Sequence, residues 1–116
     1  MMAPSPHTLA IRKLNDAMRA RIPEVDPANK VLLTIGVRQL HMLEQIALAI
    51  EVREFAAFSP DNDPHGEHDF GSIAFQGTRY FWKIDYYDRQ MQMHSPDPAD
   101  PAVTSRVLTI MRADEY

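Results

Sequence analysis

Apolar residues recur along this chain at spacings that predict a helix first and a strand after it. Between residues 8 and 21 they fall at Ile11, Leu14 and Met18, which is the spacing of one buried helix face. Residues 30–35 form a short apolar run rich in β-formers, which is typical of a strand covered on both faces.

The longest helical pattern runs from about residue 38 to residue 55 and carries two apolar stripes. The first stripe consists of Leu43, Ile46, Ala47 and Ile50, and the second of Leu48, Val52 and Phe55. Two stripes make a wide apolar arc, so we expect this segment to be the central helix of the core.

Alternating apolar and polar residues predict a hairpin over residues 70–87, with a turn at Gly77. The alternation in its second strand predicts that the face carrying Trp82 lies against the core. After a loop, Asp100 and Pro101 predict the start of a last helix ending near residue 113. Its expected buried stripe consists of Val103, Val107, Ile110 and Met111.

This order of elements predicts an α+β domain, with a small antiparallel sheet of three to four strands packed against about three helices. A chain of 116 residues fits one domain, which we place at residues 8–116 after a flexible tail at residues 1–7. Cysteine is absent, and neither a membrane span nor a secretory signal is visible. We therefore expect a cytoplasmic protein that does not contact a membrane.

Charge is unevenly distributed along the chain. The formal net charge is −4, and residues 54–100 carry nine acids but only three bases. Between Glu54 and Thr78 there is no lysine or arginine. An acidic face disfavours direct binding of nucleic acid, because contacts to phosphate are cationic. It favours a cation or a protein partner with a basic surface.

Residues 59–71, here called the acidic segment, hold the highest density of acidic and histidine side chains in the sequence. Their acids and imidazoles are Asp61, Asp63, His65, Glu67, His68 and Asp69. One hypothesis is a divalent metal bound by Asp61, Asp63, His65, His68 and Asp69, a nitrogen and oxygen set suited to zinc, manganese or iron. With help from Lys83 and Asp85, such a site predicts a metal-dependent hydrolase. Calcium fits less well, because Ser72 stands where a calcium loop needs a bidentate glutamate.

A second hypothesis is a non-enzymatic module that binds a protein partner through its acidic face. The residues expected to make this contact are Asp61, Asp63, His65, Glu67, Asp69, Asp85, Tyr87 and Asp88. If the partner's basic groove normally holds nucleic acid, the module would inhibit it by imitating phosphates, as some anti-CRISPR proteins do. We favour this role, which needs no catalytic residue and no cofactor.

A third interpretation is structural. Aspartate and asparagine in proline-rich loops bond to their own backbone, and His68 can pair with Asp69 to fix the loop. The residues leave these three interpretations open.

Four blocks of this sequence resemble the bacterial family called domain of unknown function 3768. They are residues 61–71, 81–88, 97–103 and 106–111. The resemblance covers about residues 9–116 and implies a bacterial, phage or plasmid origin. The chain departs from the family pattern at His41-Met42 and at residues 91–94, so the resemblance gives His94 no role. It implies no activity.

Overall fold

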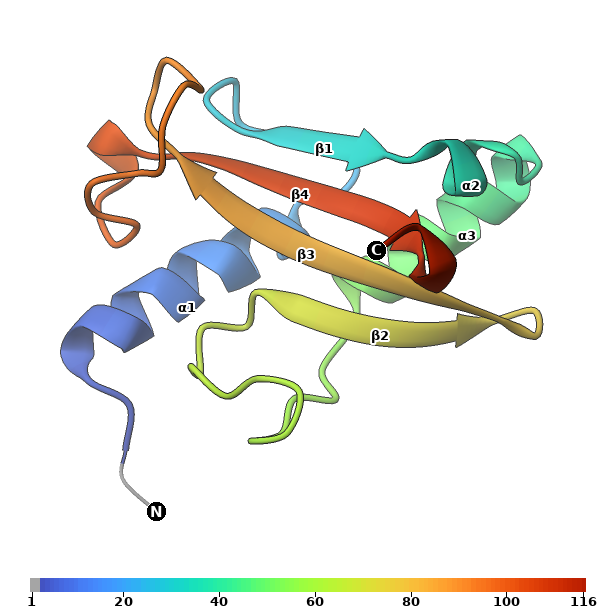
Figure 1. Cartoon of the computed structure of the whole chain (residues 1–116), viewed down its shortest axis with the longest axis horizontal. Coiled ribbons are helices and arrows are strands. Elements are labelled where there is room, and N and C mark those ends of the chain that lie inside the picture. Colours follow the sequence, from blue (N-terminus) through green and yellow to red (C-terminus); the bar gives the residue numbers. More distant parts are fainter. Residues whose placement is uncertain (1–2) are drawn as a thin grey trace.

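A four-stranded mixed sheet organises residues 3–116, the part of the chain that the computed structural model describes (Figure 1). The strands are β1 (Lys30–Leu33), β2 (Phe70–Phe75), β3 (Thr78–Tyr87) and β4 (Ser105–Arg112), in the spatial order β1-β4-β3-β2. The predicted α+β class is confirmed. The sheet is not wholly antiparallel, because β1 runs parallel to β4. The long connection between these two strands leaves enough chain for a parallel crossover.

Helices cover one face of this sheet. They are α1 (Pro6–Ala20), α2 (Ile35–Arg38) and α3 (Met42–Arg53). Two short 3-10 turns, η1 (Pro101–Val103) and η2 (Ala113–Glu115), precede and follow β4. Figure 1 shows α1 and α3 behind the sheet and η2 in front of it. Within the described range, no helix is both long and apolar enough to cross a membrane.

Helix α1 begins earlier than predicted, because Ser5 caps it. The Ser5 hydroxyl accepts a hydrogen bond from the Thr8 backbone nitrogen at 3.1 Å, and Pro6 occupies the first helical position. Residues 6 and 7 of the predicted tail therefore belong to the helix. Residues 1 and 2 of that tail lie outside the described residues.

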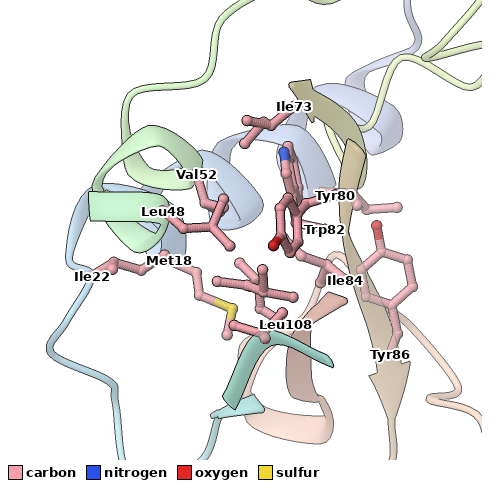
Figure 2. Packing of buried hydrophobic residues seen from close by; sticks show 13 residues of the cluster. Met18, Ile22, Leu48, Val52, Ile73, Tyr80, Trp82, Ile84, Tyr86 and Leu108 are labelled. Atoms are coloured by element: carbon pink, nitrogen blue, oxygen red, sulfur yellow. The ribbon is translucent and has the colours of Figure 1, made fainter. Parts of the chain in front are cut away.

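The core fills the space between the sheet and the helices, with the fully buried Trp82 at its centre. Figure 2 shows Leu48 and Val52 of α3 on the opposite side from Trp82 and Ile84 of β3, with Met18 of α1 beside them. The alternation predicted for β3 is confirmed, since Tyr80, Trp82, Ile84 and Tyr86 are all buried.

The predicted last helix is wrong, because residues 105–112 form β4. This strand has neighbours on both sides, and Val107, Leu108, Ile110 and Met111 are all at most 4% exposed. A strand buried on both faces is apolar at successive positions, so part of its pattern also matches helical spacing. The predicted helix start forms only the short turn η1, where the Asp100 carboxylate accepts a hydrogen bond from the Ala102 backbone nitrogen at 2.9 Å.

Helix α3 is not the central helix that its two stripes predict. Leu48 and Val52 of the second stripe are fully buried. In the first stripe Leu43 is 79% exposed, Ile46 49% and Ile50 40%. The helix therefore lies at the edge of the core and presents an apolar face outward.

Candidate functional site

Helix α1 holds the acidic segment through polar side chains on one of its faces. Arg12 donates its Nε to the carbonyl oxygen of Gly66 at 2.6 Å. Three residues later, Asn15 donates its Nδ2 to the carbonyl oxygen of Glu67 at 3.0 Å. Residues three or four apart share a helix face. This face of α1 thus binds the backbone of the acidic segment.

His68 fixes the end of the segment with its ring and its backbone. Its Nδ1 lies 2.8 Å from Oδ1 of Asp16, and its backbone nitrogen donates to Oδ1 of Asp63 at 3.1 Å. The ring stacks on Phe58, and its Nε2 lies 3.7 Å from the second oxygen of Asp63. The structural interpretation named Asp69 as the partner of His68. The structure instead pairs His68 with Asp16 and Asp63.

Arg19 is a buried cation on the same helix. It is 5% exposed, and its guanidinium lies over the rings of both Phe58 and Trp82, 5.2 and 4.8 Å from their centroids. It donates to two carbonyl oxygens near the C-terminal end of α3 and to Asp16. Burial lowers its pKa, and Asp16 opposes that shift. The signal for this role was the spacing of Arg12, Asn15, Asp16 and Arg19 along one helix face.

A buried polar network joins the segment to the sheet through Asn15, which is fully buried. Asn15 accepts from Nε of Arg106 at 2.8 Å and donates to the hydroxyl of Tyr86 at 2.8 Å. Tyr86 in turn donates to Oε1 of Glu67 at 2.8 Å. Burial raises the pKa of Tyr86, so the hydroxyl keeps the proton it donates. Glu67 is therefore bonded within the domain.

The five residues of the metal hypothesis do not come together as one ligand set. Asp63 and His68 are bonded inside the loop, whereas Asp61 and His65 are exposed. Asp69 is half-buried and borders a different hollow from His68. Across residues 3–116, no group of three or more histidine or acidic side chains is placed to hold a metal ion.

Five of the eight residues expected to bind a partner border one open groove, here called the acidic groove. It consists of two adjoining hollows of about 420 and 320 Å³ that share Asp69, Ile84 and Asp85. The polar and aromatic residues on its border include Asp61, His65, Asp69, Lys83, Asp85, Tyr87, His94 and Tyr116. His94 and Tyr116 were not among the residues expected to bind.

The groove forms where β2 ends and β3 continues. Phe70 is the first residue of β2 and pairs with Lys83, so β3 extends beyond this pair without β2 beside it. The three other residues of the expected set do not border the groove. Asp63 and Glu67 are bonded to the fold as described above, and Asp88 accepts from the Gln92 backbone nitrogen at 2.9 Å.

Asp69 is a half-buried carboxylate on the border of this groove. Burial raises its pKa above the ordinary value, and the charges of Glu67 and Asp63 raise it further, while a backbone hydrogen bond and the charge of His65 oppose part of that shift. The groove's lysine, Lys83, lies 2.9 Å from Asp85, which raises the pKa of that lysine. In the part of the chain that the structure describes, no salt bridge reaches Asp69. The groove is therefore suited to a cationic group brought by another molecule.

Comparison with known proteins identifies a family. The family model described as protein of unknown function (DUF3768) matches residues 33–115, which include the acidic segment and the whole border of the groove except the last residue. No curated protein and no solved structure matches the chain. Because the match spans well over half of its length, the chain belongs to the family of unknown function DUF3768.

Proposed function

We propose that this protein is a non-enzymatic binding module whose acidic groove receives a basic side chain of a protein partner. The observation that carries this proposal is Asp69, a half-buried carboxylate among like charges. A lysine or arginine placed beside it would add a salt bridge that the described residues do not supply. In the free protein the half-buried charge of Asp69 lowers stability, and an ion pair in the complex would offset this loss.

The border of the groove supports arginine as the side chain received. Tyr87 and His94 lie at one end, and Tyr116 lies at the other. A guanidinium group can stack on such rings while it donates a bidentate pair of hydrogen bonds to a carboxylate. Asp61 and Asp85 extend the negative field beyond Asp69, which favours a partner surface with several bases.

We further propose that the partner's basic surface normally binds nucleic acid, so that the module acts as an inhibitor. Nine acids against three bases in residues 54–100 support this, because a negative surface competes with phosphate for the same cations. The proposed setting is the cytoplasm of a bacterium, with the module as an accessory protein of a phage or plasmid. The alternative, a metal-dependent hydrolase, has less support because Asp63 and His68 are engaged within the loop.

Binding of an arginine-rich peptide, measured by calorimetry at low salt, tests the groove. We expect Asp61→Asn with Asp69→Asn to weaken binding at least about tenfold, through the loss of two charges in the groove. The control is Glu24→Gln with Asp114→Asn, which removes two exposed acids outside the groove and changes net charge equally. An equal loss in both variants would show that only net charge matters, and the groove proposal would be wrong.

Asp63 is kept unchanged in this experiment, because it is 8% exposed and bonds to the backbone of His68. A separate experiment tests the inhibitor role. This experiment uses a bacterial protein that binds the wild type but not the groove variant. A DNA oligonucleotide is added to the complex as competitor. Release of that protein by the oligonucleotide supports inhibition. Retention at saturating oligonucleotide contradicts inhibition and leaves the binding module intact.

A further inference from the structure

A separate hollow, here called the arginine hollow, lies between α1 and the start of β4 and has a volume of about 530 Å³. It shares no lining residue with the two hollows of the acidic groove. One of its walls is a single face of α1 and its C-terminal end, where Leu14, Met18 and Arg21 recur at helical spacing. The loop after α1 and the turn η1 form other walls. A hollow of this size suits a small molecule.

Arg106 of β4 is a buried cation that lines this hollow, and it is only 3% exposed. Its Nε donates to Oδ1 of Asn15 at 2.8 Å, and its Nη2 donates to the carbonyl oxygen of Pro98. The guanidinium lies over the ring of Tyr86, 5.2 Å from the centroid. These three partners are all uncharged. The remaining nitrogen, Nη1, makes no hydrogen bond to residues 3–116 and is not fully buried. A donor of Arg106 is therefore left for a ligand.

The charge of Arg106 has no salt bridge within residues 3–116. Burial lowers the pKa of Arg106, and Tyr86 and Glu67 oppose that shift electrostatically. An arginine nevertheless stays protonated at neutral pH. Glu67 acts without direct contact, since its carboxylate bonds to the hydroxyl of Tyr86. Because arginines are almost never fully buried unless they are paired, an anion in the hollow would supply what this position lacks.

Two further arginines and two acids border the hollow. Arg21 and Arg89 are exposed, and Nη1 of Arg89 donates to a carbonyl oxygen of η1 at 3.4 Å. Asp26 lies 4.0 Å from Arg21, with both side chains about half exposed, and Glu24 is exposed. Solvent screens these four exposed charges, whereas it screens the buried Arg106 far less. The charge that decides which ligand enters is therefore positive.

We propose that the arginine hollow binds a small organic anion, with a carboxylate or phosphate head on Arg106 and an apolar body along α1 and η1. Leu14 and Met18 of α1 and Pro101 of η1 provide the apolar contact. A hydrogen bond from a guanidinium to a carboxylate or phosphate is charge-assisted and stronger than a neutral one. This site goes beyond the proposed function, because it needs neither the acidic groove nor a protein partner.

Three probes with the same aromatic ring test the hollow: benzoate, phenyl phosphate and benzyl alcohol. Each is titrated into the full chain labelled with ¹⁵N, and NMR follows the amide signals. We expect benzoate or phenyl phosphate to shift the signals of residues 14–29 and 101–106 saturably, and the tighter of the two identifies the head group. Benzyl alcohol, which has no charge, should bind at least about tenfold more weakly. Shifts that do not saturate or that fall outside these residues, or equal binding of the alcohol, would overturn the proposal.

The same titration tests the role of Arg106 without replacing it, because Arg106 also supports the fold through Asn15. The side-chain Nε signal of Arg106 should shift together with the amide signals, and more with the tighter anion than with benzyl alcohol. Amide signals that shift while this signal stays in place would mean that the head group does not lie on Arg106.

Variants at the exposed border test the contribution of charge. Arg21→Gln with Arg89→Gln should weaken binding of the tighter anion at least about threefold, because two positive charges near the head group are lost. Arg38→Gln with Arg79→Gln is the matched control, since both arginines are exposed and lie outside the hollow. Equal weakening in the two double variants would show that only net charge matters and would contradict the site.

The groove variant, Asp61→Asn with Asp69→Asn, separates this inference from the proposed function. It should keep the anion affinity of the wild type, because neither residue lines the arginine hollow. Loss of anion binding in this variant would contradict an independent site. A wild type that binds the anion but not the arginine-rich peptide would support the arginine hollow and refute the groove alone.

Discussion

The imidazole ring of His68 lies flat against the phenyl ring of Phe58, with 3.8 Å between the ring centroids and 3° between the planes. This stack joins the two ends of the loop that carries the acidic segment. Since Asp16 holds the same imidazole from α1, the loop is fixed on both sides. A fixed loop offers its carboxylates to a ligand with little ordering cost on binding.

Removal of this stack should loosen the loop selectively. We expect Phe58→Ala to cost about 1–3 kcal/mol of the free energy of unfolding and to speed amide exchange in residues 59–69. Hydrogen exchange followed by mass spectrometry measures both the rate and its location. Phe81→Ala is the matched control, because Phe81 is also half-buried but packs against Phe70 and Tyr116. Equal acceleration in both variants would contradict a specific role for the stack.

Asn15→Leu should destabilise the domain strongly. Asn15 is fully buried, and its amide serves the guanidinium of Arg106, the hydroxyl of Tyr86 and the carbonyl of Glu67. An apolar replacement leaves a buried cation short of an acceptor, which costs about 2–4 kcal/mol. Urea unfolding measures this loss. Lys13→Leu, at an exposed position of the same helix, should change the midpoint little.

Asp69→Asn should stabilise the free protein at neutral pH. The folded state raises the pKa of Asp69 above 3.8, so it binds a proton more tightly than the unfolded chain does. Stability contributed by this group is therefore present below 3.8 and is lost as pH rises through the folded pKa. The variant should match the wild type in acid and exceed it at neutral pH by no more than about 1 kcal/mol, since solvent screens a half-exposed group.

Unfolding by urea at a series of pH values measures this difference. A gain that does not change with pH would mean that the carboxylate charge is not its cause. A stabilised variant that binds the arginine-rich peptide less well would show that the groove exchanges stability for binding.

Gly71→Ala should cost far more stability than Gly77→Ala. A Cβ atom at Gly71 would stand 2.1 Å from Nε1 of the fully buried Trp82. Neither atom has room to move, so we expect a loss of about 3 kcal/mol or more and a changed near-ultraviolet spectrum of the indole. At Gly77 a Cβ atom meets no described atom within 4 Å, and only the φ of +79° opposes it. That change should cost about 1 kcal/mol in thermal or urea unfolding. Similar losses at the two sites would contradict the steric argument.

Local sequence patterns were sufficient to predict those elements in which buried residues recur at one regular spacing. The alternation of β3 correctly placed Trp82 and its neighbours in the core, because one face of that strand meets the helices. The same reasoning failed for β4, where burial of both faces removes the alternation. Its β-branched residues, among them Val107, Thr109 and Ile110, were the signal that favoured a strand.

The candidate site was only partly predictable for a different reason. The acids of residues 59–69 were identifiable from their density, but their separate roles depend on side chains some fifty residues earlier. Asp16 bonds to His68, and Asn15 bonds to Glu67, so both residues of the segment are held within the domain. No local pattern in the segment distinguishes these residues from Asp69, which takes no part in these contacts.

The position of β4 has a consequence for how the chain reaches its folded state. This strand lies between β1 and β3, yet it is the last of the four to be synthesised. Until residues 105–112 emerge from the ribosome, β1 has no neighbour in the sheet and the indole of Trp82 has no closed core around it. Domains generally fold as units during synthesis, and an incomplete one exposes apolar surface. A truncated translation product without β4 should therefore be a substrate for chaperones and proteases rather than a smaller version of this protein.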